Sequence, residues 1–252
     1  MMKSQWLIAG KESLQMLRCR RGSLWLLAYA GLLSAFSLLL VSNTELSLLD
    51  NAQVIYMMAG TVLAAGALIT VVLGSDAYAG EKERGTLVPL LVSPMDAAQL
   101  LQGKALGLLG AWAVMFALAA PYLWGVGASG QNLGAALFYL ALFGTPVVLG
   151  FGCLAMAISA GTGSVLTSLL SALILLLLAA LPLWLGPSLR GTLIAKLVDA
   201  VNPVAGALNT FDSVIIDSQA FGAQIGRLCL VFSWLGLCLV LARRKTVRPN
   251  FQ

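Results

Sequence analysis

The chain has 252 residues, of which 60% are hydrophobic and 10% are charged, and its mean hydropathy is +0.92. Soluble domains carry charge on roughly a quarter of their residues, so this composition excludes a water-soluble globule and predicts a surface that faces lipid. The chain contains no histidine, which excludes Ser/His/Asp and Cys/His catalysis and HExxH metal sites. Its four cysteines form no CxxC pair. We therefore expect no enzymatic activity, no metal site and no cofactor bound by this chain.

The first predicted element is an amphipathic helix within residues 1–22. Projection of residues 6–18 at 100° per residue places most apolar side chains, including Trp6, on one half, with Ile8 the exception. The polar side chains on the other half are Lys11, Glu12, Gln15 and Arg18. We expect this interfacial elbow helix to lie at the cytoplasmic headgroups, its basic side toward anionic membrane lipid. A solvated tail is the alternative.

Six apolar runs are long enough to span the membrane, since about 20 helical residues cross roughly 30 Å of hydrocarbon. They are residues 23–41, 53–75, 105–124, 134–159, 165–185 and 225–242. Small, turn-forming residues at 159–164 separate the fourth run from the fifth, which we interpret as a tight hairpin. Between their ends the spans contain no Lys, Arg, Asp or Glu, with Arg227 near an interface. Ion-coupled carriers usually need an intramembrane carboxylate, so this class is disfavoured.

The basic residues predict the orientation of the chain. The predicted interfacial helix, the loop at 76–104 and the tail at 243–252 carry 12 of the 15 Lys and Arg residues. Basic loops stay on the cytoplasmic side, so both termini are predicted to be cytoplasmic. The net charge of +5 follows from this topology and gives no reason to expect a nucleic-acid partner.

The predicted loop at 76–104 concentrates charge in a chain that otherwise avoids it. Its charged residues include Asp76, Glu81, Lys82, Glu83, Arg84 and Asp96, and its apolar residues include Leu87, Leu90, Leu91 and Val92. We interpret the apolar part as a short amphipathic helix that starts at Gly85 and Thr86 and stops at Pro94. Asp96 and Gln99 have the spacing of a capping box for the third span. A solvated connector whose leucines reach the interface is the alternative.

The predicted outer loop at 186–224 contains a second amphipathic pattern. Apolar residues recur at helical spacing from 188 to 201, and Asn202 followed by Pro203 predicts the end of this helix. Such a helix either caps the outer end of the spans or fills the space between the fifth and the sixth.

A motif in the charged loop resembles a known family. The pattern D-x4-E-x-E-x-G-T-L-x2-L-L-x2-P is formed here by Asp76, Glu81, Glu83, Gly85, Thr86, Leu87, Leu90, Leu91 and Pro94. Together with the six spans and the interfacial helix, it resembles the permease subunits of ABC-2 type ABC transporters. Within that family the likeness is to the group of the gliding-motility and nitrous oxide reductase maturation permeases. A weaker likeness, at Phe143–Pro146, is to the haem-exporter B permease of cytochrome maturation.

The resemblance implies an all-α polytopic membrane protein of the ABC-2, type V exporter-like fold, with one permease domain over residues 1–252. It also implies a coupling helix between spans two and three that contacts a cytoplasmic ABC ATPase subunit. The contact residues carried over from the family are Glu81, Glu83, Arg84, Gly85, Thr86, Leu90 and Pro94. No GxxxxGK[ST] motif is present, so ATP and Mg are expected on the partner ATPase.

The function implied by the resemblance is export across the bacterial inner membrane, driven by ATP hydrolysis in the separate ATPase subunit. The expected assembly has two permease copies, as a homodimer or with a close paralogue, and two ATPase copies, and it admits a periplasmic accessory protein. The alternatives are a membrane scaffold or assembly protein without transport, and a haem-exporter-like permease. The charge-free spans do not identify a cargo.

Overall fold

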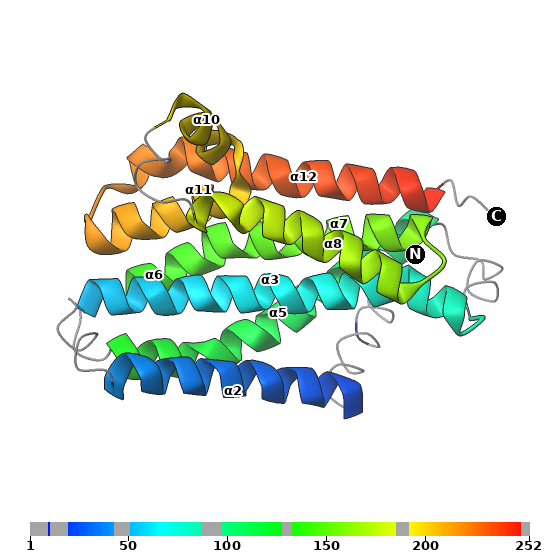
Figure 1. The fold of residues 1–252 in the computed structure, drawn as a ribbon, viewed down its shortest axis with the longest axis horizontal. Coiled ribbons are helices and arrows are strands. Elements are labelled where there is room, and N and C mark those ends of the chain that lie inside the picture. Colours follow the sequence, from blue (N-terminus) through cyan, green and yellow to red (C-terminus); the bar gives the residue numbers. More distant parts are fainter. Residues whose placement is uncertain are drawn as a thin grey trace.

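The computed structural model describes residues 10, 20–42, 51–86, 97–127, 133–184 and 192–247. These residues form helices and contain no β-strand, which confirms the predicted all-α class within the described part of the chain. Figure 1 shows the long helices lying side by side in one elongated bundle. Helices suit lipid because each satisfies its backbone N–H and C=O groups within one segment.

Five stretches of the described chain are long and apolar enough to cross a membrane: Gly22–Ser42, Asn51–Glu83, Ala97–Gly127, Leu133–Gly161 and Phe221–Thr246. The corresponding elements are α2 (Arg20–Ser42), α3 (Asn51–Glu83), α5 (Ala97–Gly127), the continuous rod of α6, η2 and α7, and α12 (Ile225–Val247). They include the first four predicted spans and the sixth. The chain is thus an integral membrane protein by its helices, in agreement with its composition.

The predicted fifth span forms a shorter apolar element. Residues 165–184 fold as α8 (Val165–Ala180) followed by a 3-10 helix, η3 (Leu181–Trp184). The 16 residues of α8 rise about 24 Å, less than the roughly 30 Å of a hydrocarbon core. Six membrane-crossing helices therefore stay a prediction, beside five long helices in the described residues.

Helices α3 and α7 form the centre of the bundle, and α7 also packs along α12. Glycine permits this close approach, because a Cβ added at Gly74 of α3 would meet the backbone carbonyl oxygen of Gly152 in α7. The hydroxyl of Thr70 donates a hydrogen bond to the carbonyl oxygen of Val148 at 3.1 Å. Small residues at helix contacts and hydroxyl bonds between helices are typical of membrane bundles.

The rod from residue 133 to 161 is not a uniform α-helix. It consists of α6 (Leu133–Tyr139), the π-helical turn η2 (Leu140–Gly144) and α7 (Thr145–Gly161). Pro146 follows the π-helical turn, which is consistent with the need to relieve the clash between a proline ring and the carbonyl four residues earlier. Trp112 of α5 donates its Nε1–H to Thr145 Oγ1 at 2.9 Å and ties α5 to this point.

The predicted outer loop contains more structure than its sequence pattern indicates. The described part forms α10 (Leu193–Val201), α11 (Pro203–Phe211), the π-helical turn η4 (Asp212–Ile216) and the 3-10 helix η5 (Phe221–Gln224). The predicted amphipathic helix is present as α10, and it ends before Asn202 and Pro203 as expected. The same two residues also begin α11, because Asn202 Oδ1 accepts hydrogen bonds from the N–H groups of Val204 and Ala205. Most side chains of α11 are buried in the bundle.

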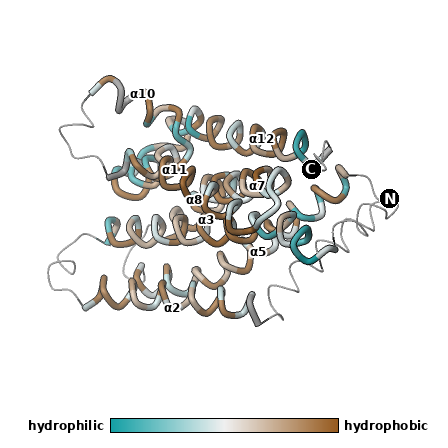
Figure 2. The backbone as a smooth tube through the Cα atoms, turned by 45° about the vertical axis from the view of Figure 1, so that its right-hand side comes forward, coloured by the Kyte–Doolittle hydropathy of each residue, from teal (hydrophilic) through white to brown (hydrophobic). Residues whose placement is uncertain are grey.

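The charged residues of the described chain lie at the two ends of the bundle (Figure 2). We call the charged end the one at which α3, α7 and α12 end and α5 and α8 begin (Figure 1). Its charged residues include Asp76, Glu81, Lys82, Glu83, Arg84, Lys104, Arg243, Arg244 and Lys245. A small cluster of buried apolar side chains joins these helix ends, including Tyr78, Leu100 and Ala242. The charged residues near the opposite end include Asp199, Asp212, Asp217 and Arg227.

At the opposite end, Arg227 connects α12 to α11, η4 and η5. Its Nη1 donates to Asn209 O at 3.0 Å, Ser213 Oγ at 3.0 Å and Gln224 Oε1 at 2.7 Å. The sequence indicated an arginine near an interface, and the structure satisfies its guanidinium with protein oxygen atoms. Such pairing is what a cation next to hydrocarbon requires.

Candidate functional site

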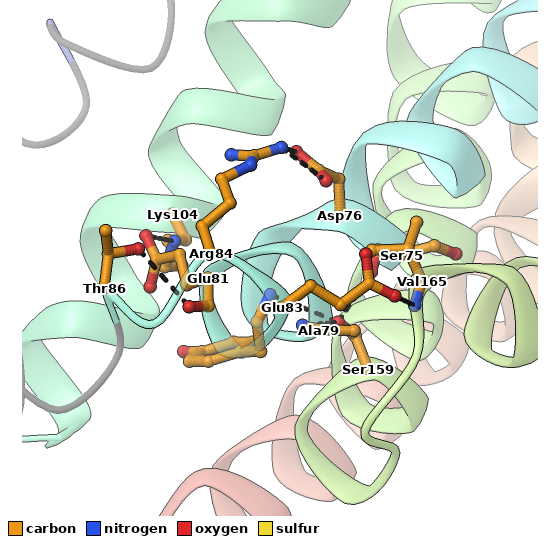
Figure 3. Close-up of polar contacts among 11 residues, drawn as sticks. Ser75, Asp76, Ala79, Glu81, Glu83, Arg84, Thr86, Lys104, Ser159 and Val165 are labelled. Carbon is orange, nitrogen blue, oxygen red and sulfur yellow. Dashed lines mark hydrogen bonds and ion pairs between the residues drawn. The ribbon is translucent and has the colours of Figure 1, made fainter.

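The candidate site is the charged end of α3. The helix continues beyond its apolar part through residues 76–83, so the predicted cytoplasmic loop begins as helix, and it returns to helix at Ala97. Figure 3 shows the charged side chains of these last two turns reaching toward different neighbours. The densest cluster of charged residues in the described chain thus lies at the end of a helix and not in a loop.

Gly85 ends α3 in a geometry that glycine adopts without strain. Its φ of +69° is left-handed, and its N–H donates to Lys82 O at 3.0 Å. The N–H of Thr86 donates to Glu81 O at 2.9 Å, which completes a Schellman motif at the helix end. Gly85 and Thr86, from which the sequence predicts the start of an amphipathic helix, thus form the end of α3, and the predicted helix stays a prediction. Residues 87–96, which include the predicted contacts Leu90 and Pro94, lie outside the described residues.

Asp76 and Arg84 form an ion pair along the outer side of α3. Arg84 Nη2 lies 2.8 Å from Asp76 Oδ1 and 2.9 Å from Oδ2, and both side chains are 46% exposed. The pair spans eight residues, and Gly80 lies beneath it, because a Cβ there would meet the Asp76 carboxylate. An ion pair as exposed as this one contributes at most about 1 kcal/mol to stability. Its effect is to orient the Arg84 side chain.

Glu81 forms a second ion pair that is mostly shielded from solvent. Lys104 of α5 donates from Nζ to Glu81 Oε1 at 2.9 Å, with side-chain exposures of 3% for the lysine and 17% for the glutamate. The ammonium also lies 5.3 Å from the centroid of the Tyr78 ring. This pair joins α3 to α5, the helices that precede and follow residues 87–96, so it fixes the spacing between the end of α3 and the start of α5.

Lys82 and Glu83 bind the turn between α7 and α8. Lys82 Nζ donates to the carbonyl oxygens of Ala160 at 2.7 Å and Thr162 at 2.9 Å. Glu83 Oε1 accepts a hydrogen bond from the N–H of Val165 at 2.8 Å, as Figure 3 shows. Lys82 therefore binds the end of α7, and Glu83 binds the start of α8.

Ser159 of α7 inserts its hydroxyl into the backbone of α3. Its Oγ donates to Ser75 O at 2.7 Å and accepts from the N–H of Ala79 at 2.7 Å and of Tyr78 at 3.1 Å (Figure 3). In an uninterrupted α-helix, Ser75 O and the N–H of Ala79 would bond to each other. Ser159 is completely buried, so this contact fixes α7 against the end of α3.

The structure brings together five of the residues that the sequence singled out: Glu81, Glu83, Arg84, Gly85 and Thr86. The other two, Leu90 and Pro94, and the predicted interfacial residues Trp6, Lys11, Glu12 and Arg18 lie outside the described residues. Sequence reasoning missed Lys104 and Ser159 as members of the site. A lone lysine close to the start of an apolar run could have indicated Lys104, whereas nothing in the pattern distinguishes Ser159 from other small residues.

The charged and hydroxyl groups of this arrangement bond the ends of neighbouring helices. Among the described residues, no group of three or more His, Cys, Asp or Glu side chains is placed to hold a metal ion. The described cysteines, Cys153, Cys229 and Cys238, are free thiols. Ion pairs and helix caps at one end of a membrane bundle suit a mechanical contact between helices.

The sequence matches a known protein family. A family model described as ABC-2 family transporter protein matches residues 6–215, which run from the predicted interfacial helix into η4. No curated protein matches the chain. The match covers more than half of the chain and includes the whole charged end of α3. The chain therefore belongs to the ABC-2 transporter family, as a membrane-spanning, non-catalytic permease subunit of an ABC transporter.

Proposed function

We propose that the chain is the permease subunit of an ATP-driven exporter in the bacterial inner membrane. A separate ABC ATPase subunit binds ATP and Mg and contacts the charged end, at the point where α3 leaves the bundle. The observation that carries this proposal is the fixed end of α3. Its last two turns are held by ion pairs and hydrogen bonds to α5, α7 and α8, and Gly85 turns the chain into residues 87–96.

The distribution of basic residues supports a cytoplasmic position for the charged end. Lys82, Arg84 and Lys104 lie there together with three basic residues at the end of α12, Arg243, Arg244 and Lys245. Figure 1 shows the ends of α3 and α12 on the same side of the bundle. Because short basic segments remain in the cytoplasm, this arrangement supports cytoplasmic termini and a contact with an ATPase inside the cell.

The permease receives the energy of ATP hydrolysis through contact with the ATPase subunit. Proteins that bind nucleotide phosphates in the P-loop manner need a glycine-rich loop with lysine, and this sequence has none. Movement of the ATPase subunits must therefore be passed on by helices whose ends are firmly held. The Glu81–Lys104 pair and the bonds of Lys82 and Glu83 supply such a connection at one end of the bundle.

The proposed assembly has two permease copies and two ATPase copies, with membrane lipid around the helices and a periplasmic accessory protein as a further partner. Exposed apolar side chains on α2, α8 and α12 support contact with lipid and with a second copy. The export direction, and a relationship to the gliding-motility and nitrous oxide reductase maturation group, rest on the resemblance of the Gly85 motif.

Co-expression with an ABC ATPase encoded beside the chain tests this function. The two proteins are expected to purify together, and the ATPase rate in nanodiscs is expected to depend on residue 85. Gly85→Pro lowers the rate to that of the ATPase alone, because proline cannot adopt φ of +69° and lacks the N–H that bonds Lys82 O. Gly85→Asn is the matched control and keeps the rate, since asparagine tolerates the left-handed region.

The scaffold alternative predicts a different outcome from the same samples. A membrane scaffold would retain the ATPase without affecting its turnover, so wild type, Gly85→Pro and Gly85→Asn would hydrolyse ATP at one rate. Equal rates would contradict the proposed function, and so would the failure of the wild-type chain to bind the ATPase.

A further inference from the structure

The turn between α7 and α8 presents two helix ends of opposite polarity. Helix α7 ends at Gly161 and α8 begins at Val165. The last carbonyl groups of a helix carry partial negative charge, and the first N–H groups carry partial positive charge. The last carbonyl groups of α7 and the first N–H groups of α8 therefore lie within a few residues of each other in this turn.

Lys82 and Glu83 match this polarity. The Lys82 ammonium binds carbonyl oxygens at the end of α7, and the Glu83 carboxylate accepts the N–H of Val165 at the start of α8. The N-cap residue of α8, Ser164, makes no capping hydrogen bond with its own side chain. Helix α8 thus receives its N-terminal cap from α3, across 82 residues of sequence.

A second hydrogen bond holds the other end of α8. Asn202 Nδ2 donates to the carbonyl oxygen of Ala179, in the last turn of α8. The same side chain caps α11, since its Oδ1 accepts the N–H of Val204 at 2.9 Å. Asn202 therefore joins the end of α8 to the start of α11. Figure 1 shows α11 lying toward the end of the bundle opposite the charged end.

Between these two attachments, α8 is less deeply buried than α3 or α7. Its fully buried residues are Ser168 and Ala172, both small; Leu169, Leu173 and Leu176 are partly buried against the core, and Leu166, Leu170 and Ile174 are exposed. Partial burial removes less apolar surface than full burial, so packing holds α8 less firmly than α3 or α7. The hydrogen bonds at its ends consequently have a large share in setting where α8 lies.

We propose that α8 mechanically couples the end of α3 to α11, with Glu83, Lys82 and Asn202 as the positioning residues. A displacement of the end of α3 moves the start of α8 through Glu83 and the adjoining end of α7 through Lys82, and the end of α8 moves α11 through Asn202. The assignment of the displacement to an ATPase rests on the proposed function, but the connection itself is a property of this chain. It links the charged end to α11 at the opposite end.

Hydrogen exchange in the full chain, purified in nanodiscs without any partner, tests the connection. Glu83→Ala removes the cap of α8 and is expected to speed amide exchange within 203–211 roughly 2- to 30-fold, the range that coupling between distant sites produces. Arg84→Ala is the matched control. Arg84 is the next residue of the chain and is exposed, but it bonds Asp76 rather than α8, so exchange in α11 stays at the wild-type rate. Glu83→Gln keeps an acceptor oxygen and has a smaller effect of the same sign.

A double variant separates transmission along α8 from general loosening. Asn202→Ser can still cap α11 through its hydroxyl, but it is too short to reach Ala179 O. In the Asn202→Ser background, Glu83→Ala is expected to leave exchange within 203–211 unchanged while still speeding exchange at 165–168. The proposal is overturned if Glu83→Ala acts on 165–168 alone in the wild-type background. Equal effects of Glu83→Ala and Arg84→Ala on α11, or additive effects of the double variant, overturn it as well.

Addition of the ATPase with AMP-PNP and Mg distinguishes this proposal from the proposed function. Both proposals hold if the nucleotide alters exchange in 203–211 in the wild type and does so less in Glu83→Ala. A change that is equal in the two proteins supports ATPase contact but contradicts transmission through α8. Absence of any nucleotide effect, beside a Glu83→Ala effect without the partner, contradicts the proposed function and leaves the connection supported.

Discussion

At the residue scale, the charged positions that stand out in the sequence have partners inside the chain. Charge is rare here, so Glu81, Glu83 and Arg84 could be selected from composition and motif alone. Their partners could not, because Lys104 lies 23 residues from Glu81 and Val165 lies 82 residues from Glu83. Such contacts depend on how helices pack, and no local pattern records them. Contact of these residues with an ATPase stays a prediction.

The shielded ion pair gives a residue-scale prediction. Lys104→Met leaves the Glu81 carboxylate without its cation and is expected to lower the free energy of unfolding by about 3 kcal/mol, the low end for a buried pair, since Glu81 is 17% exposed. Adding Glu81→Gln recovers part of this loss, with an interaction energy of about 0.5–3 kcal/mol between the two sites.

The free energy of unfolding is measured in mixed detergent–SDS micelles for the wild type, Lys104→Met, Glu81→Gln and the double variant. Arg84→Met is the exposed control and is expected to change the free energy of unfolding by less than about 1 kcal/mol, because its side chain is 46% exposed. Strictly additive effects of Lys104→Met and Glu81→Gln would show that the two side chains do not interact in the membrane protein.

At the element scale, the long helices and the amphipathic α10 were predictable, whereas α11 and the π-helical turns were not. Runs of about 20 apolar residues predict α2, α3, α5, the rod ending at Gly161, and α12, because no other structure satisfies so long a backbone in lipid. The sequence pattern places α11 within the predicted outer loop at 186–224. Helix α11 is too short to span, and Asn202 and Pro203 before it indicate a helix end as readily as a helix start. The π-helical turn before Pro146 leaves no distinct pattern in the sequence.

The contact between α3 and α7 gives an element-scale prediction. Gly74→Ala places a methyl group against the carbonyl oxygen of Gly152, which is backbone and cannot turn aside. The two helices must move apart, and overpacking of this kind costs about 1–3 kcal/mol. The free energy of unfolding in SDS mixtures should fall accordingly.

Gly236→Ala in α12 is the control for Gly74→Ala. No described atom lies within 4 Å of the added methyl group, so this variant should be neutral or slightly more stable. If both variants unfold at the same SDS fraction as the wild type, the close approach of α3 and α7 does not exist in the membrane.

At the scale of the whole molecule, one apolar bundle carries its charges at its ends. The family match over residues 6–215 and the five long apolar helices agree on a membrane permease of the ABC-2 family. The composition already indicated the membrane, and the motif around Gly85 indicated the family. The internal bonding of the charged end was unpredictable, because it joins α3 to α5, α7 and α8 through contacts between distant segments.

The most direct test concerns which end of the bundle meets the ATPase. A photoreactive benzoylphenylalanine replaces Thr86, which is exposed at the charged end, or Leu197, which is 60% exposed on α10 near the opposite end. Irradiation of the purified complex is expected to link the ATPase to the chain at position 86 and not at position 197. A product at 197, or none at 86 in a complex that hydrolyses ATP, would contradict the account.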